Sequence, residues 1–146
     1  MKLTELTTYQ TTVTQARAHR VLKSKTSYFL RDHNITMMQW AIIGSLYAAG
    51  SDGMRVSDLA QQLDTSLAFV TTTLNVLEAK GIVTRANHAQ DNRAKIVRLT
   101  PAFTPKVEII EKELSKKLCD WLIPAVGQED LAIYIKVLDK IAQAAS

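Results

Sequence analysis

The chain has 146 residues, with 18 Lys and Arg against 14 Asp and Glu, so its formal net charge is +4 and its pI is about 9.3. Apolar residues make up 47% and charged residues 22%, a globular balance that excludes wholesale disorder. The single cysteine excludes an intrachain disulfide framework and favours a reducing compartment.

The length fits one domain or one tightly joined unit, because domains typically have about 100–200 residues. No apolar run approaches the roughly 18 residues that a membrane span needs. The first eight residues contain one Lys and no apolar core, so we expect no secretory signal and a cytoplasmic protein.

The first helix is predicted over residues 4–31, which lack Gly and Pro, and His33-Asn34 ends it. The second helix begins with a capping box formed by Thr36 and Gln39 and continues to the glycine-rich turn at residues 49–53. Apolar side chains at helical spacing predict one apolar face on each helix: Leu6, Val13, Val21 and Tyr28 in the first, and Met38, Ile42 and Leu46 in the second.

A short helix and a longer helix follow an extended piece at residues 54–56. We expect Ser57 to cap the short helix and Ser66 to cap the longer one, which ends at Lys80-Gly81. The predicted inner face of the longer helix consists of Leu67, Val70, Leu74 and Leu77.

Two strands are predicted at residues 82–86 and 95–99, joined by a polar loop, and together they make a hairpin. A long helix then starts at Thr100-Pro101, with Pro101 in its first turn, and is interrupted by Pro124 and Gly127 before a last helix. Short helix, turn, longer helix and hairpin make a winged helix-turn-helix. The predicted fold is therefore mainly α, with a small β-hairpin wing.

The terminal helices carry more apolar surface than so small a central unit can cover. A second copy is the commonest solution, although packing on the chain's own central unit is the alternative. We therefore expect residues 1–34 and 101–146 to form a helical dimerisation region and residues 35–100 to form the winged-helix DNA-binding domain.

Several short motifs, in the right order, resemble those of MarR-type winged helix-turn-helix regulators. They are Ile35-Thr36 with Gln39-Trp40, Val56 with Leu59-Ala60, Val70-Thr71 with Leu77-Glu78, Lys80-Gly81-Ile82-Val83 with Arg85, and Asp91-Asn92-Arg93 with Val97 and Leu99-Thr100. The resemblance implies a homodimeric transcriptional regulator that binds double-stranded DNA, usually as a repressor. It also implies release by a small effector, often aromatic, bound between the dimerisation helices and the winged helix.

The predicted recognition helix carries no Lys or Arg from residue 65 to residue 79, whereas members of the family often have basic residues at positions 72 and 76. Arginine paired to guanine, the commonest specific contact, is therefore unavailable from this helix. The outward residues include groups suited to thymine methyls (Ala68, Phe69, Thr72 and Val76) and Asn75, which suits adenine. We expect an A·T-rich pseudo-palindrome; packing against a neighbouring helix is the alternative for Phe69 and Val76.

Positive charge is concentrated in residues 80–98, which hold five basic residues against one acidic. By resemblance, Arg93 enters the minor groove, and narrow A-tracts attract arginine most strongly. Asp91 is expected to order the wing. Thr65 and Ser66 at a helix N-terminus, with Arg85, Lys95 and Arg98 on the strands, are candidate phosphate contacts, although each strand cation is equally readable as a solvated charge.

A candidate effector site rests on Arg17, which interrupts an apolar stripe and so calls for an anionic partner. That partner is either an acidic side chain across the dimer or an anionic aromatic ligand, for which His19, Trp40 and Tyr47 are candidate neighbours.

Three other functions are weaker. Cys119 makes a thiol-based redox sensor conceivable, but the adjacent Asp120 disfavours a thiolate. The three histidines have no metal-ligand spacing and no nucleotide or hydrolase motif is present, so we expect no metal, no cofactor and no enzyme activity. A winged helix used only for protein contact is the remaining alternative, and it would lack salt-sensitive DNA binding.

Overall fold

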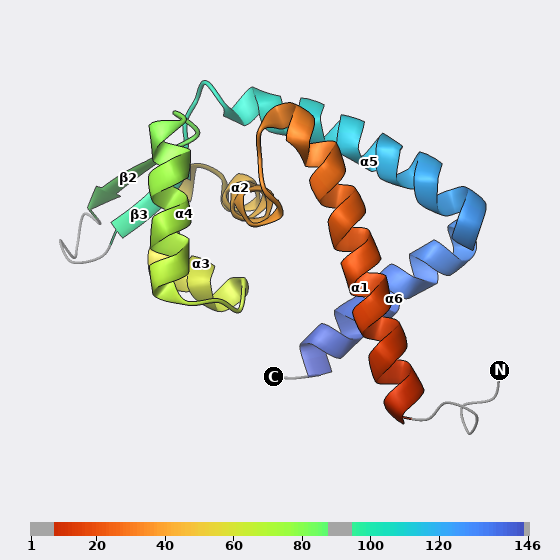
Figure 1. Cartoon of the computed structure of the whole chain (residues 1–146). Coiled ribbons are helices and arrows are strands. Elements are labelled where there is room, and N and C mark those ends of the chain that lie inside the picture. Colours follow the sequence, from red (N-terminus) through yellow and green to blue (C-terminus); the bar gives the residue numbers. More distant parts are fainter. Residues whose placement is uncertain (1–7, 88–94, 145–146) are drawn as a thin grey trace.

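The computed structural model describes residues 8–87 and 95–144 (Figure 1). Its elements, in chain order, are α1 (Thr8–Leu30), the 3₁₀ turn η2 (Arg31–His33), α2 (Met37–Ala49), the 3₁₀ turn η3 (Gly50–Asp52), β1 (Met54–Arg55), α3 (Val56–Gln62), α4 (Leu67–Ala79), β2 (Val83–Asn87), β3 (Lys95–Leu99), α5 (Thr104–Val126) and α6 (Gln128–Ala144). The predicted fold class, mainly α with a winged helix-turn-helix and a small hairpin, is confirmed.

The winged-helix unit contains a three-stranded antiparallel sheet with the order β1-β3-β2. The hairpin pairs Val83 with Leu99 at its base and Asn87 with Lys95 at its far end, and Met54 of β1 pairs with Val97. Gly53 allows β1 to approach β3 this closely, because a Cβ at Gly53 would lie 2.4 Å from the carbonyl oxygen of Val97. Figure 1 shows α3 and α4 beside this sheet, with α5 leading from it towards α1 and α6.

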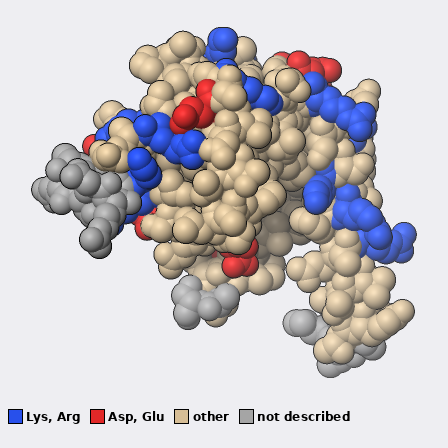
Figure 2. Space-filling model, turned by 60° about the vertical axis from the view of Figure 1, so that its left-hand side comes forward, with Lys and Arg blue, Asp and Glu red and all other residues tan. Residues whose placement is uncertain are grey.

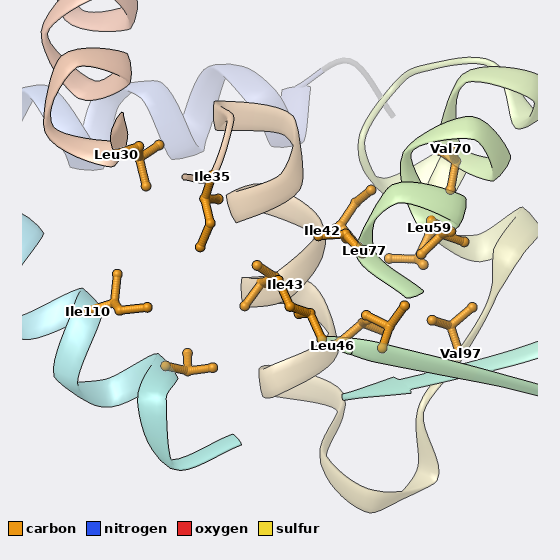
Figure 3. Close-up of a cluster of buried hydrophobic side chains, with 14 of the residues drawn as sticks. Leu30, Ile35, Ile42, Ile43, Leu46, Leu59, Val70, Leu77, Val97 and Ile110 are labelled. Atoms are coloured by element: carbon orange, nitrogen blue, oxygen red, sulfur yellow. The ribbon is translucent and has the colours of Figure 1, made fainter. Parts of the chain in front are cut away.

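Helix α2 lies at the centre of the hydrophobic core (Figure 3). Its buried residues Ile42, Ile43 and Leu46 sit between two groups of apolar side chains. One group comes from the terminal helices and includes Leu30 and Ile110. The other comes from the winged helix and includes Leu59, Val70, Leu77 and Val97. The same helix therefore supports both regions of the molecule.

The predicted start of α2 is confirmed. The backbone N–H of Gln39 donates to Thr36 Oγ1 at 3.2 Å, and the N–H of Thr36 donates to Gln39 Oε1 at 3.1 Å. Asn34, at the predicted break, adopts a left-handed conformation with φ 54°. These two local signals fix the corner between α1 and α2.

Two helix starts differ from the prediction. Helix α3 begins at Val56 with Arg55 as its N-cap, not Ser57, because Arg55 is held in an extended conformation by pairing with Ile96. Helix α5 begins at Thr104 instead of Thr100-Pro101, and Pro105 is the proline in its first turn. Thr100 donates its N–H to the carbonyl of Ile82, so the chain turns there before the helix can start.

Two other residues behave differently from expectation. Pro124 does not interrupt α5, which continues to Val126 and ends at Gly127 with φ 89°. Proline inside a helix removes the hydrogen bond to the carbonyl four residues earlier, and α5 continues for only two residues beyond Pro124. Leu67 was predicted to face inward but is 54% exposed at the first position of α4, whereas Val70 in the same turn is fully buried.

Helix α5 meets the turn after α1 through Lys117 and Glu113. Lys117 Nζ lies 3.4 Å from the carboxylate of Asp32 in η2 and donates to Glu113 at 2.7 Å, and Glu113 lies 3.1 Å from His33 Nε2. The hydrogen bond from Lys117 is the main reason why the pKa of Glu113 lies below its ordinary value. Beyond this junction the apolar faces are open: Val13, Val21 and Tyr28 of α1 are exposed, and α6 has no buried residue.

No helix within residues 8–87 and 95–144 is long and apolar enough to cross a membrane.

Candidate nucleic-acid interface

The exposed face of α4 is the centre of the candidate interface. Its N-terminus is capped by Ser66, whose Oγ accepts from the N–H of Phe69 at 3.1 Å. Val70, Leu74 and Leu77 are fully buried and anchor the helix to the core. The opposite face carries the predicted outward residues: Ser66, Ala68, Phe69, Thr72, Asn75 and Val76 are exposed, and Thr65 is half-buried. This face is uncharged, with apolar side chains at its centre.

A groove of about 660 Å³ separates α4 from the sheet and the start of α3. Three cations line it: Arg55 from β1, Arg85 from β2 and Lys95 from β3. Hydroxyl groups of Ser57 and Thr71 lie along the same groove, which also contains Glu78. Figure 2 shows basic side chains gathered in patches at the sides of the molecule, with a broad uncharged surface between them.

The strand cations make different contacts. Arg85 donates from Nε to Glu78 at 2.9 Å and from Nη2 to Asn75 at 2.6 Å, so it joins β2 to α4. Lys95 donates to Asn87 Oδ1 at 2.7 Å, across the hairpin. Arg98 instead donates to the carbonyl of Ser51 at 2.8 Å and lines a different hollow with Leu46 and other residues. The structure therefore brings Arg85 and Lys95 to the α4 groove and places Arg98 away from it.

Arg55 is a groove residue that the sequence reasoning missed. It is the only basic residue between positions 32 and 79, and it directly precedes α3. That isolated charge at a helix start was an available signal. Arg93 and Asp91, predicted for the minor groove and for ordering the wing, lie outside the described residues.

The four candidate effector residues are divided among three places. Trp40 and Tyr47 line one hollow, of about 440 Å³, between α2 and α5. Arg17 is exposed and lines a second hollow, of about 680 Å³, between α1, α5 and α6. His19 is exposed on α1 and lines neither hollow. A single site built from all four residues is therefore not formed within one chain.

The two hollows differ in chemistry. Beside Trp40 and Tyr47 lie Glu108, Glu111 and Lys112. Tyr47 donates its hydroxyl hydrogen to the carboxylate of Glu108, a bond that raises the pKa of Tyr47 because it favours the protonated phenol. The hollow beside Arg17 is mostly apolar and aromatic, with Asp130 as its acidic member: its lining is Thr14, Ala18, Val21, Leu22, Trp121, Leu122, Val126, Leu131 and Tyr134.

Within the part of the chain that the structure describes, no group of three or more His, Cys, Asp and Glu side chains is arranged to hold a metal ion. Cys119, on α5, is half-buried and unbonded to another cysteine.

Comparison with known proteins supports the fold and the family. Residues 35–95 match the model of the MarR family. The MepR–DNA complex of S. aureus is 26% identical, with a TM-score of 0.74, over 96% of this chain and 99% of that chain. The transcriptional repressor CouR bound to a 23-mer DNA duplex is 21% identical, with a TM-score of 0.82, over 96% and 94%.

E. coli MarR in its apo form is 20% identical, with a TM-score of 0.76, over 94% of this chain and 98% of that chain. The last two likenesses concern the fold alone. The family match covers residues 35–95, the winged-helix part, and the fold match to MepR extends over the terminal helices as well, so the chain carries a MarR-family winged helix and is similar to MarR-type transcriptional regulators along its length.

Proposed function

We propose that this protein binds double-stranded DNA as a homodimer and represses transcription. The observation that carries the proposal is the exposed, uncharged face of α4 beside a groove lined by Arg55, Arg85 and Lys95. A recognition helix enters the major groove, and cations at its margin, here Arg55 and Lys95, neutralise the flanking phosphates. MepR and CouR, which share this fold, are recorded in complex with DNA.

The composition of α4 favours an A·T-rich half-site. Ala68, Phe69 and Val76 present apolar surface to the groove, which suits the methyl group of thymine. Selection from a random DNA pool tests this preference. Recovery of invariant G·C pairs at every position under α4 would contradict it.

The wing supplies the second contact. We expect Arg93 to enter the minor groove next to the A·T-rich half-site. Arg93→Ala should weaken binding and make the salt dependence shallower by about 0.9 in log–log slope, because each neutralised phosphate contributes about that much. Unchanged affinity would remove the wing from the interface.

The homodimer follows from the terminal helices. Exposed apolar residues cluster on α6: Ile133, Tyr134, Ile135, Val137, Leu138 and Ile141. A helix with a large apolar face and no buried residue does not keep that face in water, and the hollow between α1, α5 and α6 lies beside it. A second copy that packs its own terminal helices against α6 covers this apolar face, with residues 1–34 and 101–146 as the dimerisation region.

An effector site is the less developed part of the proposal. We assign an anionic aromatic ligand to the hollow of Arg17, because the carboxylates of Glu108 and Glu111 make the hollow of Trp40 and Tyr47 unfavourable for an anion. Calorimetry with a panel of aromatic acids tests it. Heat that is lost in Arg17→Ala, with the dimer intact, supports the ligand role; a dimer that falls apart in Arg17→Ala shows instead that Arg17 pairs across the subunits.

The most informative experiment is a gel shift with the DNA upstream of the protein's own gene, repeated at several salt concentrations. Steep salt dependence and competition by that DNA, but not by random DNA, are expected for a specific regulator. Absence of salt-sensitive binding to this DNA and to a random pool would favour the winged helix as a protein-contact module.

A further inference from the structure

Arg85 connects the wing to the reading face of α4. Its guanidinium donates to Asn75 Oδ1 at 2.6 Å and to Glu78 Oε2 at 2.9 Å. Asn75 and Glu78 lie on α4, whereas Arg85 comes from β2, where it pairs with Val97. The two bonds leave the Arg85 side chain only 22% exposed. An arginine predicted to touch phosphate is thus occupied by the recognition helix.

The contact fixes which way the Asn75 amide faces. A guanidinium has only donors, so the Asn75 atom that meets it must be the acceptor Oδ1. Nδ2, with two N–H donors, then remains available on the exposed side chain. The two-bond contact with adenine needs Oδ1 to accept from the base while Nδ2 donates. In this arrangement Oδ1 is turned to Arg85 instead.

Glu78 determines how Arg85 acts. Its carboxylate lies against Arg85 Nε and opposes the guanidinium charge beside the DNA-facing surface. An arginine paired in this way contributes little net positive charge to a phosphate. Its planar fork, by contrast, holds two side chains one turn apart on α4 in a fixed geometry, whereas the ammonium group of a lysine is a point charge with rotatable donors.

We propose that Arg85 is a positioning residue for base recognition: it holds Asn75 as a hydrogen-bond donor, so that Asn75 selects a major-groove acceptor. The bases that offer such an acceptor without an adjacent donor are thymine, through O4, and guanine, through O6 and N7. This inference rests on the proposed DNA-binding function and replaces the expected pairing of Asn75 with adenine.

The test uses the full chain and a duplex that the unaltered protein selects from a random pool. Binding is measured to that duplex and to every single-base-pair variant of it, for Arg85→Lys, Asn75→Ala, the double variant and Lys95→Ala. Arg85→Lys keeps the charge but lacks the fork. Lys95→Ala is the matched control, because Lys95 lines the same groove and donates across the hairpin to Asn87.

Arg85→Lys and Asn75→Ala should lose base discrimination at the same base pair, by about fivefold or more, which is the usual size of one specific contact. The double variant should lose no more base discrimination than either single variant, because both substitutions remove the same contact between Arg85 and Asn75. The salt slope of Arg85→Lys should match that of the unaltered protein. Lys95→Ala should instead change the salt slope and leave base discrimination unaltered, because it should weaken binding to all duplexes equally.

Two results would overturn the proposal. If Arg85→Lys keeps all base preferences while Arg85→Ala weakens every duplex equally and lowers the salt slope by about 0.9, Arg85 is a phosphate contact. If Arg85→Lys and Asn75→Ala lose discrimination at different base pairs, the two residues act separately. Failure of the unaltered protein to select any sequence is a different result, since it refutes the proposed function itself. A thermal melt of each variant verifies that it is folded.

Discussion

The winged-helix unit buries the apolar side of its helix α4, whereas the terminal helix α6 leaves its apolar side chains exposed. In the winged helix, the buried side of α4 faces a closed core, and Val70, Leu74 and Leu77 are all 0% exposed. In α6, every large apolar residue named above is at least 39% exposed. One region is complete within a single chain, whereas the other presents a surface that water does not favour. The stability of the winged helix and the assembly of the terminal helices are therefore distinct properties, and a substitution can change one without the other.

The largest expected effect is in the winged-helix core. Leu74→Ala removes a fully buried side chain and should lower the free energy of unfolding by about 2–5 kcal/mol. Leu67→Ala, the same change on the same helix at a 54% exposed position, is the matched control and should change it by about 0.5 kcal/mol or less. Urea unfolding at one fixed protein concentration measures both. If both variants lost the same free energy of unfolding, burial of the side chain within the chain would not determine the size of the loss.

The second prediction concerns assembly. Leu138→Glu places a charge on the exposed apolar face of α6 and should raise the dimer dissociation constant by about tenfold or more, because an unpaired carboxylate is costly to bury. Sedimentation equilibrium is the measurement. Phe69→Glu, a similarly exposed position on α4, should leave the dimer intact. A monomeric unaltered protein, or dissociation by both substitutions, would break the assignment of the two surfaces.

A smaller effect is expected at the α4 cap, where stability and DNA binding meet. Ser66→Ala removes the bond to the N–H of Phe69 and should cost about 1 kcal/mol of stability. Ser66→Asp keeps the cap and should restore stability, but its charge should repel a phosphate at the helix N-terminus. Unfolding and DNA titrations should therefore rank the two variants in opposite orders. The same ranking in both assays would show that no phosphate approaches Ser66.

The smallest effect is a pH dependence at the junction of α1 and α5. Because Lys117 lowers the pKa of Glu113 in the folded protein, the pair stabilises the fold above the ordinary pKa of 4.5. That stabilisation is lost as pH falls from there through the lower folded pKa. Melting temperatures from pH 7 to pH 3 should fall less steeply in Glu113→Gln and in Lys117→Met than in the unaltered protein. Identical slopes in all three proteins would remove this ion pair from the acid response.

Local signals made much of the fold predictable. The capping box at Thr36 and Gln39, the Ser66 cap and the stop at Gly81 all act within a few residues, so they are visible in the sequence. The two helix starts that were predicted wrongly are set by residues that lie far away in the sequence. Helix α3 begins after Arg55 because Arg55 is held extended by pairing with Ile96, and α5 starts late because the N–H of Thr100 donates to the carbonyl of Ile82.

The candidate interface divides in the same way. Helical periodicity was enough to predict that Ala68, Phe69 and Thr72 face outward, because a 3.6-residue repeat fixes one face once the other is buried. It could not place Arg98 away from the groove or Arg55 within it, since neither position follows from the spacing along one helix. Nor could it separate Arg17 of α1 from Trp40 and Tyr47 of α2, which the fold brings to two different hollows.

The sequence by itself determined the order of the elements, most of their caps and the uncharged character of α4, because these depend on residue type and near neighbours. Only the tertiary structure decided what the side chains around α4 are free to do. Arg85 lies ten residues from Asn75 along the chain and on another element, yet it donates to the Asn75 amide. The hydrogen-bonding capacity of a reading residue depends on which partner already occupies it, and only the folded chain brings that partner into contact.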